Sequence, residues 1–375
     1  MYLAVHDSES PLKPVSYKDP DLHRSEIDAL FTGAWHVIGL ASRVSRDGDY
    51  LAGEIAGIPV VVRNFSGTRV ALRNVCSHRH SQLVEPGCGR SERLKCPFHG
   101  WEYGADGRTR RIPEPRNFPH LDREKFRLAV YSVDVCGDLL FVKISPDGPT
   151  LKEWLGEMFE RLETWCQPGN WQLSAQRSIP YPANWKIPVE TSLESYHIPE
   201  VHPKTFGKDP GETVTSHTLG SRVTSFSTES EPVRLPEKLL SFTERFVLAF
   251  HGVTPSGRYE HHHIFPNLLV SHTDSMTLIH SVIPATAESS VGHVWQFRRC
   301  SSGRNPVVRA LSWWWGKVMA ILAQRVLNED LSIYSKVQAG VSCALQSALL
   351  GRCEERILAF HEYISRQMNE RDVVS

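Results

Sequence analysis

Two short segments, Cys76-Ser77-His78 and Cys96-Pro97-Phe98-His99, dictate much of what this chain can become. Each offers one thiolate and one imidazole, and seventeen residues separate them. A strand-like run, Arg69 to Val75, ends directly before the first segment, so its ligands lie just past a strand end, where two loops can converge. The pattern predicts a metal site held between two loop tips.

Two cysteines and two histidines are the ligands of a Rieske [2Fe–2S] cluster, in which Cys binds one iron and His the other. We therefore predict that Cys76, His78, Cys96 and His99 bind such a cluster. Zinc accepts the same four ligands, but its usual order is a Cys pair followed by a His pair. A disulfide between Cys76 and Cys96 is disfavoured because the chain shows no secretory signal.

Composition excludes several classes of partner. The 42 basic and 42 acidic residues among 375 cancel, so net charge draws the chain neither to nucleic acid nor to an anionic membrane. The longest apolar stretch, Leu311 to Leu322, contains Lys317, which predicts a packed helix rather than a membrane span. We expect a cytoplasmic enzyme with no nucleic-acid or membrane partner.

The chain is long enough for two domains with proper cores. We expect an N-terminal helical segment over residues 1–33, an all-β cluster domain over 34–150 and a second domain over 151–375. Helical periodicity begins at Leu151 and continues to Trp165; strands are expected from about 258 to 299, and helices at 306–339 and 349–369. Strands followed by helices predict an α+β fold, with a helix-plus-antiparallel-sheet domain after the β domain.

A second metal site is indicated by Glu194, His197 and His202. Glu194 and His197 are three residues apart, which predicts one helix face, and Pro199 would end that helix and return His202 toward His197. Two His and one carboxylate bind the non-haem Fe(II) that activates dioxygen. The acid would come from Glu329 or Asp330, and spacing alone leaves the choice open; a polar helix face and isolated histidines are the alternative interpretation.

With both motifs in view, the chain resembles the oxygenase (α) subunit of the Rieske non-haem iron oxygenases, the ring-hydroxylating and demethylating family. The resemblance covers nearly the whole chain and includes Asn184-Trp185-Lys186 and Phe265-Pro266-Asn267. It implies that Asp330, the second acid of its pair, joins His197 and His202 as an iron ligand. It also implies that Glu194 bridges His99 of one subunit to His197 of its neighbour, and hence a head-to-tail homotrimer.

The resemblance further implies an oxygenase that uses O2 and electrons from a separate flavin or iron–sulfur NAD(P)H reductase, directly or through a ferredoxin. Glu194, where most members have Asp, is characteristic of the branch that acts on quaternary ammonium compounds. We therefore expect hydroxylation or oxidative N-dealkylation of a small alkylammonium substrate. Aromatic ring hydroxylation, by cis-dihydroxylation or monooxygenation, is one alternative, and an electron-transfer protein without oxygenase activity is another. A second departure is His80, which stands where a glycine is common.

Overall fold

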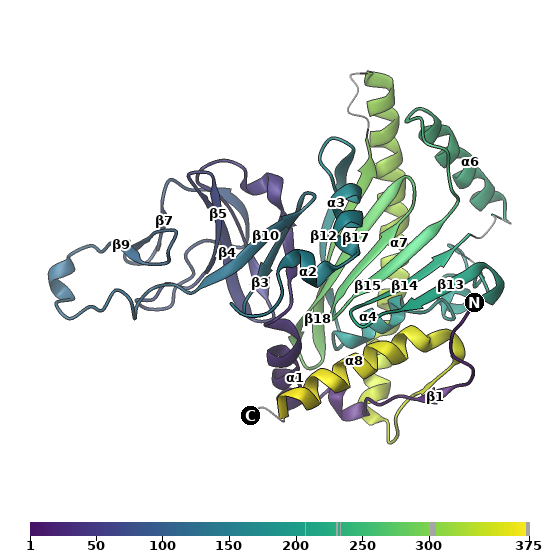
Figure 1. Cartoon of the computed structure of the whole chain (residues 1–375), viewed down its shortest axis with the longest axis horizontal. Coiled ribbons are helices and arrows are strands. Elements are labelled where there is room, and N and C mark those ends of the chain that lie inside the picture. The colour runs from purple at the N-terminus through teal and green to yellow at the C-terminus, as the bar shows by residue number, and fades with distance from the viewer. Residues whose placement is uncertain (207, 230–231, 233, 301–304, 373–375) are drawn as a thin grey trace. The chain divides into compact units, whose positions relative to one another are not determined.

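The computed structural model describes residues 1–206, 208–229, 232, 234–300 and 305–372. It divides into two compact units. One is Phe31–Glu163; the other joins Met1–Leu30 to Thr164–Ser375. Figure 1 shows the β-rich first unit and the larger second unit with its long helix α7.

The unit Phe31–Glu163 is built on antiparallel strands. Its seven-stranded sheet has the order β2-β11-β10-β5-β4-β3-β6, and a three-stranded sheet has the order β7-β8-β9. The strands are β2 (His36–Leu40), β3 (Asp49–Ile55), β4 (Ile58–Phe65), β5 (Thr68–Arg73), β6 (Gly87–Arg90), β7 (Leu94–Lys95), β8 (Glu102–Tyr103), β9 (Thr109–Arg111), β10 (Val130–Cys136) and β11 (Leu139–Lys143).

Strand β4 explains why this unit has two cores. Val60, Val61 and Val62 are all fully buried, although successive side chains point to opposite faces of a sheet. Val61 packs with Cys76, Cys96 and their neighbours, whereas Val60 and Val62 pack in the other cluster. The two cluster cysteines therefore belong to a hydrophobic core that is supported from the sheet.

The second unit contains an antiparallel seven-stranded sheet of order β12-β18-β17-β16-β15-β14-β13. Its strands are β12 (Trp171–Tyr181), β13 (Thr215–Leu219), β14 (Val223–Thr228), β15 (Tyr259–Ile264), β16 (Leu268–His272), β17 (Met276–Thr286) and β18 (Ser289–Arg299). Helix α7 (Pro306–Cys343) contacts β12 and β18, and Figure 1 shows it lying along the sheet.

The remaining elements are short except α6 and α8. The helices are α1 (Pro20–Glu26), α2 (Leu151–Leu155), α3 (Met158–Trp165), α4 (Lys186–Ser192), α5 (Ile198–Val201), α6 (Leu235–Ala249) and α8 (Glu355–Asp372). Single turns are η1 (Pro14–Tyr17), η2 (Ile27–Phe31), η3 (Ala41–Val44), η4 (Pro115–Asn117), η5 (Glu212–Val214) and η6 (Arg352–Glu354). Strand β1 (Ser8–Glu9) pairs with β19 (Leu349–Leu350).

The α+β prediction is confirmed, with the β domain preceding the helix-plus-sheet domain. The N-terminal segment differs from the expectation, because Met1–Leu30 belongs to the second unit instead of standing alone. Two contacts explain this: β1 pairs with β19, and Glu26 lies 2.7 Å from the buried Nζ of Lys186. The single helix expected from Leu151 to Trp165 is two, because α2 ends at Gly156, which has a φ of 55°.

The strands and helices expected near the C-terminus agree closely with β15 to β18 and with α7 and α8. The polar stretch before them holds β13 and β14, which its composition did not reveal. Within the described residues, no helix combines the length and apolar character that crossing a bilayer requires.

Candidate metal centres

The two cluster loops have the same backbone geometry. In the first, the Cys76 amide donates to the Ser81 carbonyl at 2.8 Å, and the His80 amide donates to the Cys76 carbonyl at 3.0 Å. In the second, Cys96 donates to Trp101 at 2.8 Å, and Gly100 donates to Cys96 at 3.0 Å. The fifth residue of each loop adopts a left-handed conformation: φ is 72° at Gly100 and 60° at His80. The two loops thus share one backbone scaffold, in which His78 is the third residue of its loop and His99 the fourth.

The predicted ligands of the cluster lie together at these loops. Cys76 and Cys96 are buried and close enough to hydrogen-bond, and burial raises the pKa of the Cys76 thiol. The rings of His78 and His99 have centroids 4.8 Å apart, with His99 exposed. Nδ1 of His78 is buried and has no hydrogen-bond partner among the described residues. Two adjacent thiols beside an unpartnered imidazole nitrogen fit a metal cluster.

Neighbouring side chains fix this arrangement. The Tyr103 hydroxyl lies 3.1 Å from the Cys76 sulfur and accepts a hydrogen bond from the Ser77 amide at 3.1 Å. The Trp101 ring stacks on His78 with centroids 4.8 Å apart. Hydrogen bonds to the sulfurs tune the potential of iron–sulfur clusters, and the Tyr103 hydroxyl lies at hydrogen-bond distance from the Cys76 sulfur. The sequence motif did not single out Tyr103.

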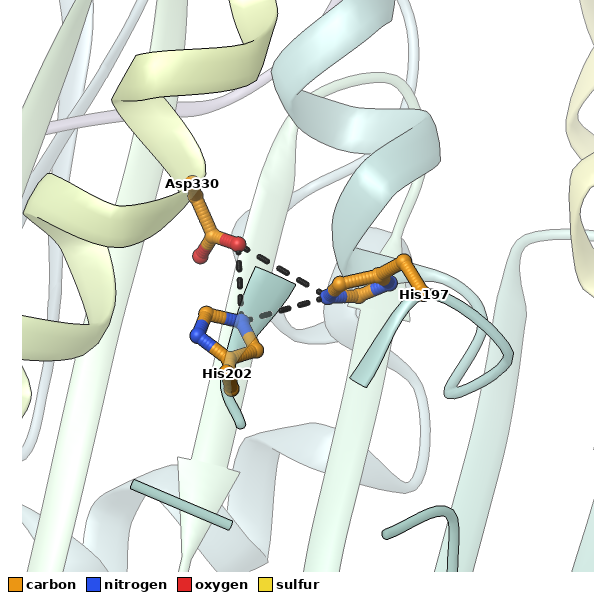
Figure 2. A group of neighbouring side chains, drawn as sticks. All are labelled: His197, His202 and Asp330. Carbon is orange, nitrogen blue, oxygen red and sulfur yellow. Dashed lines mark hydrogen bonds and ion pairs between the residues drawn. The ribbon is translucent and has the colours of Figure 1, made fainter. Parts of the chain in front are cut away.

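The second site is formed by His197, His202 and Asp330 (Figure 2). Nε2 of His202 lies 3.3 Å from Nε2 of His197 and 2.9 Å from Oδ1 of Asp330. Oδ1 of Asp330 is 3.6 Å from Nε2 of His197, and the three candidate ligand atoms lie within 4.8 Å of one another. The structure thus brings together the three residues that the resemblance singled out.

The backbone reaches this geometry differently from the expectation. Helix α4 ends at Ser192, so Glu194 and His197 do not share a helix. Pro199 is the second residue of the separate one-turn helix α5 (Ile198–Val201) instead of ending a helix, because proline is favoured in a first helical turn, where its missing N–H has no partner to lose. His197 and His202 flank that single turn at its two ends. The short turn brings the two imidazoles together.

The surrounding acids indicate that the three atoms suit a metal. Nδ1 of His197 donates to Glu194, and Nδ1 of His202 donates to Glu329 at 2.8 Å. In neutral imidazoles this leaves lone pairs on both Nε2 atoms, which face the Asp330 carboxylate. Oδ1 of Asp330 is buried, and as long as His202 is neutral it receives no hydrogen bond within the described part of the chain. Three converging lone-pair atoms repel one another unless a cation lies between them. Histidine ligands whose other ring nitrogen donates to a carboxylate are also typical of metal sites.

The geometry distinguishes the two neighbouring acids. Asp330 reaches both imidazoles, whereas Glu329 accepts hydrogen bonds from His202 Nδ1 and from Thr205 Oγ1, the latter at 2.9 Å. Burial lowers the pKa of His202, but the hydrogen bonds and charges of Asp330 and Glu329 outweigh it, so this pKa is raised. The site therefore has a negative potential that favours a bound cation.

Two tyrosines beside the site were not predicted. Tyr181, at the end of β12, and Tyr334, four residues after Asp330 on α7, form an edge-to-face pair with centroids 5.2 Å apart. Burial, and then the charge of Asp330, raises the pKa of both hydroxyls. Gly292 makes room for this pair, because a Cβ there would collide with the Tyr181 ring. Tyr334 could have been proposed from the sequence, because it follows Asp330 by one helical turn and therefore lies on the same face of α7.

Other aromatic residues lie elsewhere. Trp313 to Trp315 precede Asp330 by 15 to 17 residues on α7, about 22 to 26 Å along the helix, so they cannot wall this site. Trp315 is buried, but Trp313 and Trp314 are 56% and 47% exposed. Tyr196, next to His197, is 69% exposed and does not pack in the core.

Comparisons with known proteins agree with both centres. Residues 34–132 match the Rieske [2Fe–2S] domain, and residues 168–370 match the catalytic domain of the ring hydroxylating alpha subunit. The choline monooxygenase of Amaranthus tricolor is 28% identical over 193 residues, 50% of this chain and 43% of that protein. The glycine betaine monooxygenase oxygenase subunit of Chromohalobacter salexigens is 31% identical over 189 residues, 50% of this chain and 42% of that protein. The matches span less than half the length of these relatives.

Solved structures show the same fold. The quaternary ammonium Rieske monooxygenase CntA, crystallised with an inhibitor, superimposes with a TM-score of 0.77 at 18% identity over 96% of each chain. Naphthalene 1,2-dioxygenase superimposes with a TM-score of 0.74 at 17% identity, over 98% of this chain and 97% of that one. Because the catalytic-domain match covers more than half of the sequence, the chain belongs to the ring-hydroxylating alpha-subunit family, with a Rieske [2Fe–2S] domain ahead of the mononuclear iron domain that this family uses.

Proposed function

We propose that this chain is the oxygenase component of a Rieske oxygenase that hydroxylates or oxidatively N-dealkylates a small quaternary ammonium compound. The convergence of His197, His202 and Asp330 carries the proposal, because their three candidate ligand atoms lie within 4.8 Å of one another. Fe(II) held by two His and one carboxylate supplies free positions at which dioxygen can be activated. A bare electron carrier needs no such second site, so that alternative is disfavoured.

The chemistry consumes electrons that a separate NAD(P)H-dependent flavin or iron–sulfur reductase must supply, directly or through a ferredoxin. Monooxygenation of an N-methyl group takes one O2, two electrons and two protons. One oxygen atom forms the new C–O bond, and the other leaves as water. The N-hydroxymethyl group then breaks its C–N bond and departs as formaldehyde.

For the electron path we propose a homotrimer in which Glu194 links His197 of one subunit to His99 of its neighbour. The His197 end of this path is supported by hydrogen bonds, and the His99 end by its exposure. The Glu194 carboxylate accepts hydrogen bonds from both Nδ1 and the backbone amide of His197, the latter at 3.0 Å. His99 is exposed, and the adjacent Phe98 is 55% exposed. At the other end, Tyr196, next to His197, is 69% exposed. Exposed aromatic side chains of this kind are enriched where proteins pack together.

The substrate class is supported by the surroundings of Asp330. The carboxylates of Glu194, Glu329 and Asp330 give the site a negative potential, which suits a cationic substrate, and Tyr181 and Tyr334, each 1% exposed, support the site from the core. Glu194 in place of Asp agrees with that class, and so do the names of the choline and glycine betaine monooxygenases to which the chain is similar. Aromatic ring hydroxylation is the second candidate, because the alpha subunit of a chlorobenzene dioxygenase is 29% identical over 183 residues.

The test is a substrate screen with purified protein, a flavin reductase and NAD(P)H. Oxygen uptake is measured together with formaldehyde and with cis-diols or phenols, for a panel of trimethylammonium compounds and a panel of arenes. We expect uptake and formaldehyde with the trimethylammonium panel. Diol or phenol formation with the arenes alone would overturn the proposed substrate class in favour of the second candidate. Absence of substrate-dependent uptake with either panel, while the cluster is reduced by the reductase, would contradict the oxygenase assignment.

A further inference from the structure

The loop that follows His202 folds back onto it. The His202 carbonyl accepts hydrogen bonds from the backbone amides of Thr205 and Phe206, at 3.1 and 3.0 Å. This turn brings the Thr205 hydroxyl to the Glu329 carboxylate, to which it donates at 2.9 Å. It also sets the Phe206 ring edge-to-face against the His202 ring, with centroids 5.5 Å apart. The His202 imidazole is thus held by its own loop as well as by Glu329.

Glu329 can orient His202 only if its own carboxylate is fixed, because a long side chain otherwise keeps its rotamer freedom. The carboxylate accepts from Nδ1 of His202 at 2.8 Å, from the Thr205 hydroxyl and from Nε of Arg325 at 3.1 Å. The Arg325 side chain is 51% exposed and lies one turn away on the same helix, so this pair adds little rigidity. The Thr205 hydroxyl is therefore the contact that ties Glu329 to the loop of His202.

Arg234, which directly precedes α6, holds the outer side of the same loop. Its Nη1 donates to the Pro203 carbonyl at 3.0 Å, and its Nη2 donates to the Thr205 carbonyl at 3.2 Å. The Glu237 carboxylate, in the first turn of α6, accepts from both Nε and the backbone amide of Arg234, the latter at 3.1 Å. All three guanidinium nitrogens donate, and a planar guanidinium bound in this way has a fixed position.

Solvation alone does not require these contacts. Pro203 is exposed, so water can serve its carbonyl as well as a guanidinium can. The ion pair of Arg234 with Glu237 is partly exposed and by itself adds little to stability. The two carbonyls lie 31 and 29 residues before Arg234 in the sequence. What the contacts provide is a fixed position of the loop relative to α6.

The contacts form one continuous series from α6 to the metal site. Arg234 donates to the Thr205 carbonyl at 3.2 Å, and the Thr205 hydroxyl donates to Glu329 at 2.9 Å. Glu329 in turn accepts from Nδ1 of His202 at 2.8 Å. Nε2 of the same His202 ring lies 2.9 Å from Oδ1 of Asp330. The orientation of this ring therefore depends on where α6 holds the loop.

We propose that Arg234 is a positioning residue for the mononuclear metal site: it fixes the Thr205 loop and through it Glu329, so that Nε2 of His202 keeps its direction. This inference rests on the proposed function, because it takes the site to bind Fe(II). Losing a partner that orients a ligand costs about 10- to 100-fold in metal affinity. Because Arg234 acts through two other residues, its removal should cost about 10-fold, the lower end of this range.

The test measures Fe(II) affinity by anaerobic titration of mononuclear-iron-free protein, for variants whose melting temperature is unchanged. Nitric oxide is then added, and the electron paramagnetic resonance spectrum of its iron adduct reads the symmetry of the ligand set. Arg234→Met should lower the affinity about 10-fold and split the spectrum into more than one species, because the His202 ring then takes several orientations. Arg234→Lys, which can keep one carbonyl contact, should lose about threefold, and it keeps the test decisive if Arg234→Met does not fold.

A double-variant cycle separates positioning from general loosening. Thr205→Val removes the hydroxyl that reaches Glu329 and should also lower the affinity about 10-fold. If Arg234 acts through Thr205, the double variant should bind Fe(II) little more weakly than either single variant. Arg245→Met is the matched control, because Arg245 is an exposed arginine on the same helix α6, and it should leave both affinity and spectrum unchanged.

Three results would overturn the inference. These are an unchanged affinity and spectrum in Arg234→Met, an equal loss in Arg245→Met, and losses that multiply to about 100-fold in the double variant. If trimethylammonium compounds are oxidised while Arg234→Met binds Fe(II) like the unmodified protein, the inference fails and the proposed function stands. If the variants behave as expected and yet no substrate is oxidised, the proposed function fails separately.

Discussion

Replacing the two neighbouring acids one at a time tests which of them the metal needs. Asp330→Asn removes the carboxylate whose Oδ1 lies 3.6 Å from Nε2 of His197 and 2.9 Å from Nε2 of His202. Even a unit charge pair at 4 Å with an effective dielectric constant of 20 is worth about 4 kcal/mol, close to a thousandfold in affinity. Glu329→Gln keeps an acceptor for Nδ1 of His202, and changes of such supporting partners cost about 10- to 100-fold.

The assay is anaerobic titration of mononuclear-iron-free protein with Fe(II), with bound iron measured after gel filtration. The visible absorption of the cluster is the internal control for folding in both variants. We expect Asp330→Asn to hold essentially no mononuclear iron, while Glu329→Gln binds it with a weaker but measurable affinity. A Glu329→Gln protein that loses the iron while Asp330→Asn retains it would refute the assignment and the reasoning from geometry.

Three further predictions concern other residues. Glu194→Gln should keep both metal centres and lower coupled turnover at least 100-fold. The control is Glu200→Gln, which changes an exposed acid on α5 and should leave coupled turnover unchanged. Equal turnover of both variants would remove the bridging role. His80→Gly should raise the melting temperature of the cluster unit by roughly 2–4 °C, because the left-handed φ of 60° costs a non-glycine residue about 1 kcal/mol net; a lower value in calorimetry would contradict this. Burial lowers the pKa of His36 to about 4, so only the unfolded chain takes up this proton as the pH falls from about 6.5. Chemical denaturation at pH 7 and pH 5 should therefore show that the free energy of unfolding falls by about 2 kcal/mol more in the unmodified protein than in His36→Gln, and equal losses would exclude this origin.

The parts of the molecule that follow from local sequence were the predictable ones. The cluster loops carry their ligands within a few residues of strand ends, so spacing sufficed to propose Cys76, His78, Cys96 and His99. The strands and helices near the C-terminus follow their hydrophobic periodicity, and their observed bounds differ from the expected ones by a few residues. The sequence offered two neighbouring acids, Glu329 and Asp330, for the third ligand of the proposed iron site. Only the direction of their side chains on α7 distinguishes them.

What could not be predicted depends on contacts between distant segments. Tyr181 reaches the metal site from β12 only because the sheet packs on α7. The N-terminal residues join the second unit through pairing with β19, a partner more than 300 residues away. Pro199 was expected to end a helix, but the same restricted φ also suits the start of one, and tertiary packing selects the second outcome.

Iron and acid-labile sulfide per chain, measured on anaerobically purified protein, test the account most directly. One polypeptide with a two-iron cluster at Cys76, His78, Cys96 and His99 and a single iron at His197, His202 and Asp330 should contain about three irons and two sulfides. A colourless protein that contains zinc and no sulfide would contradict both centres. Two irons with two sulfides, unchanged after Fe(II) is supplied, would leave only an electron carrier.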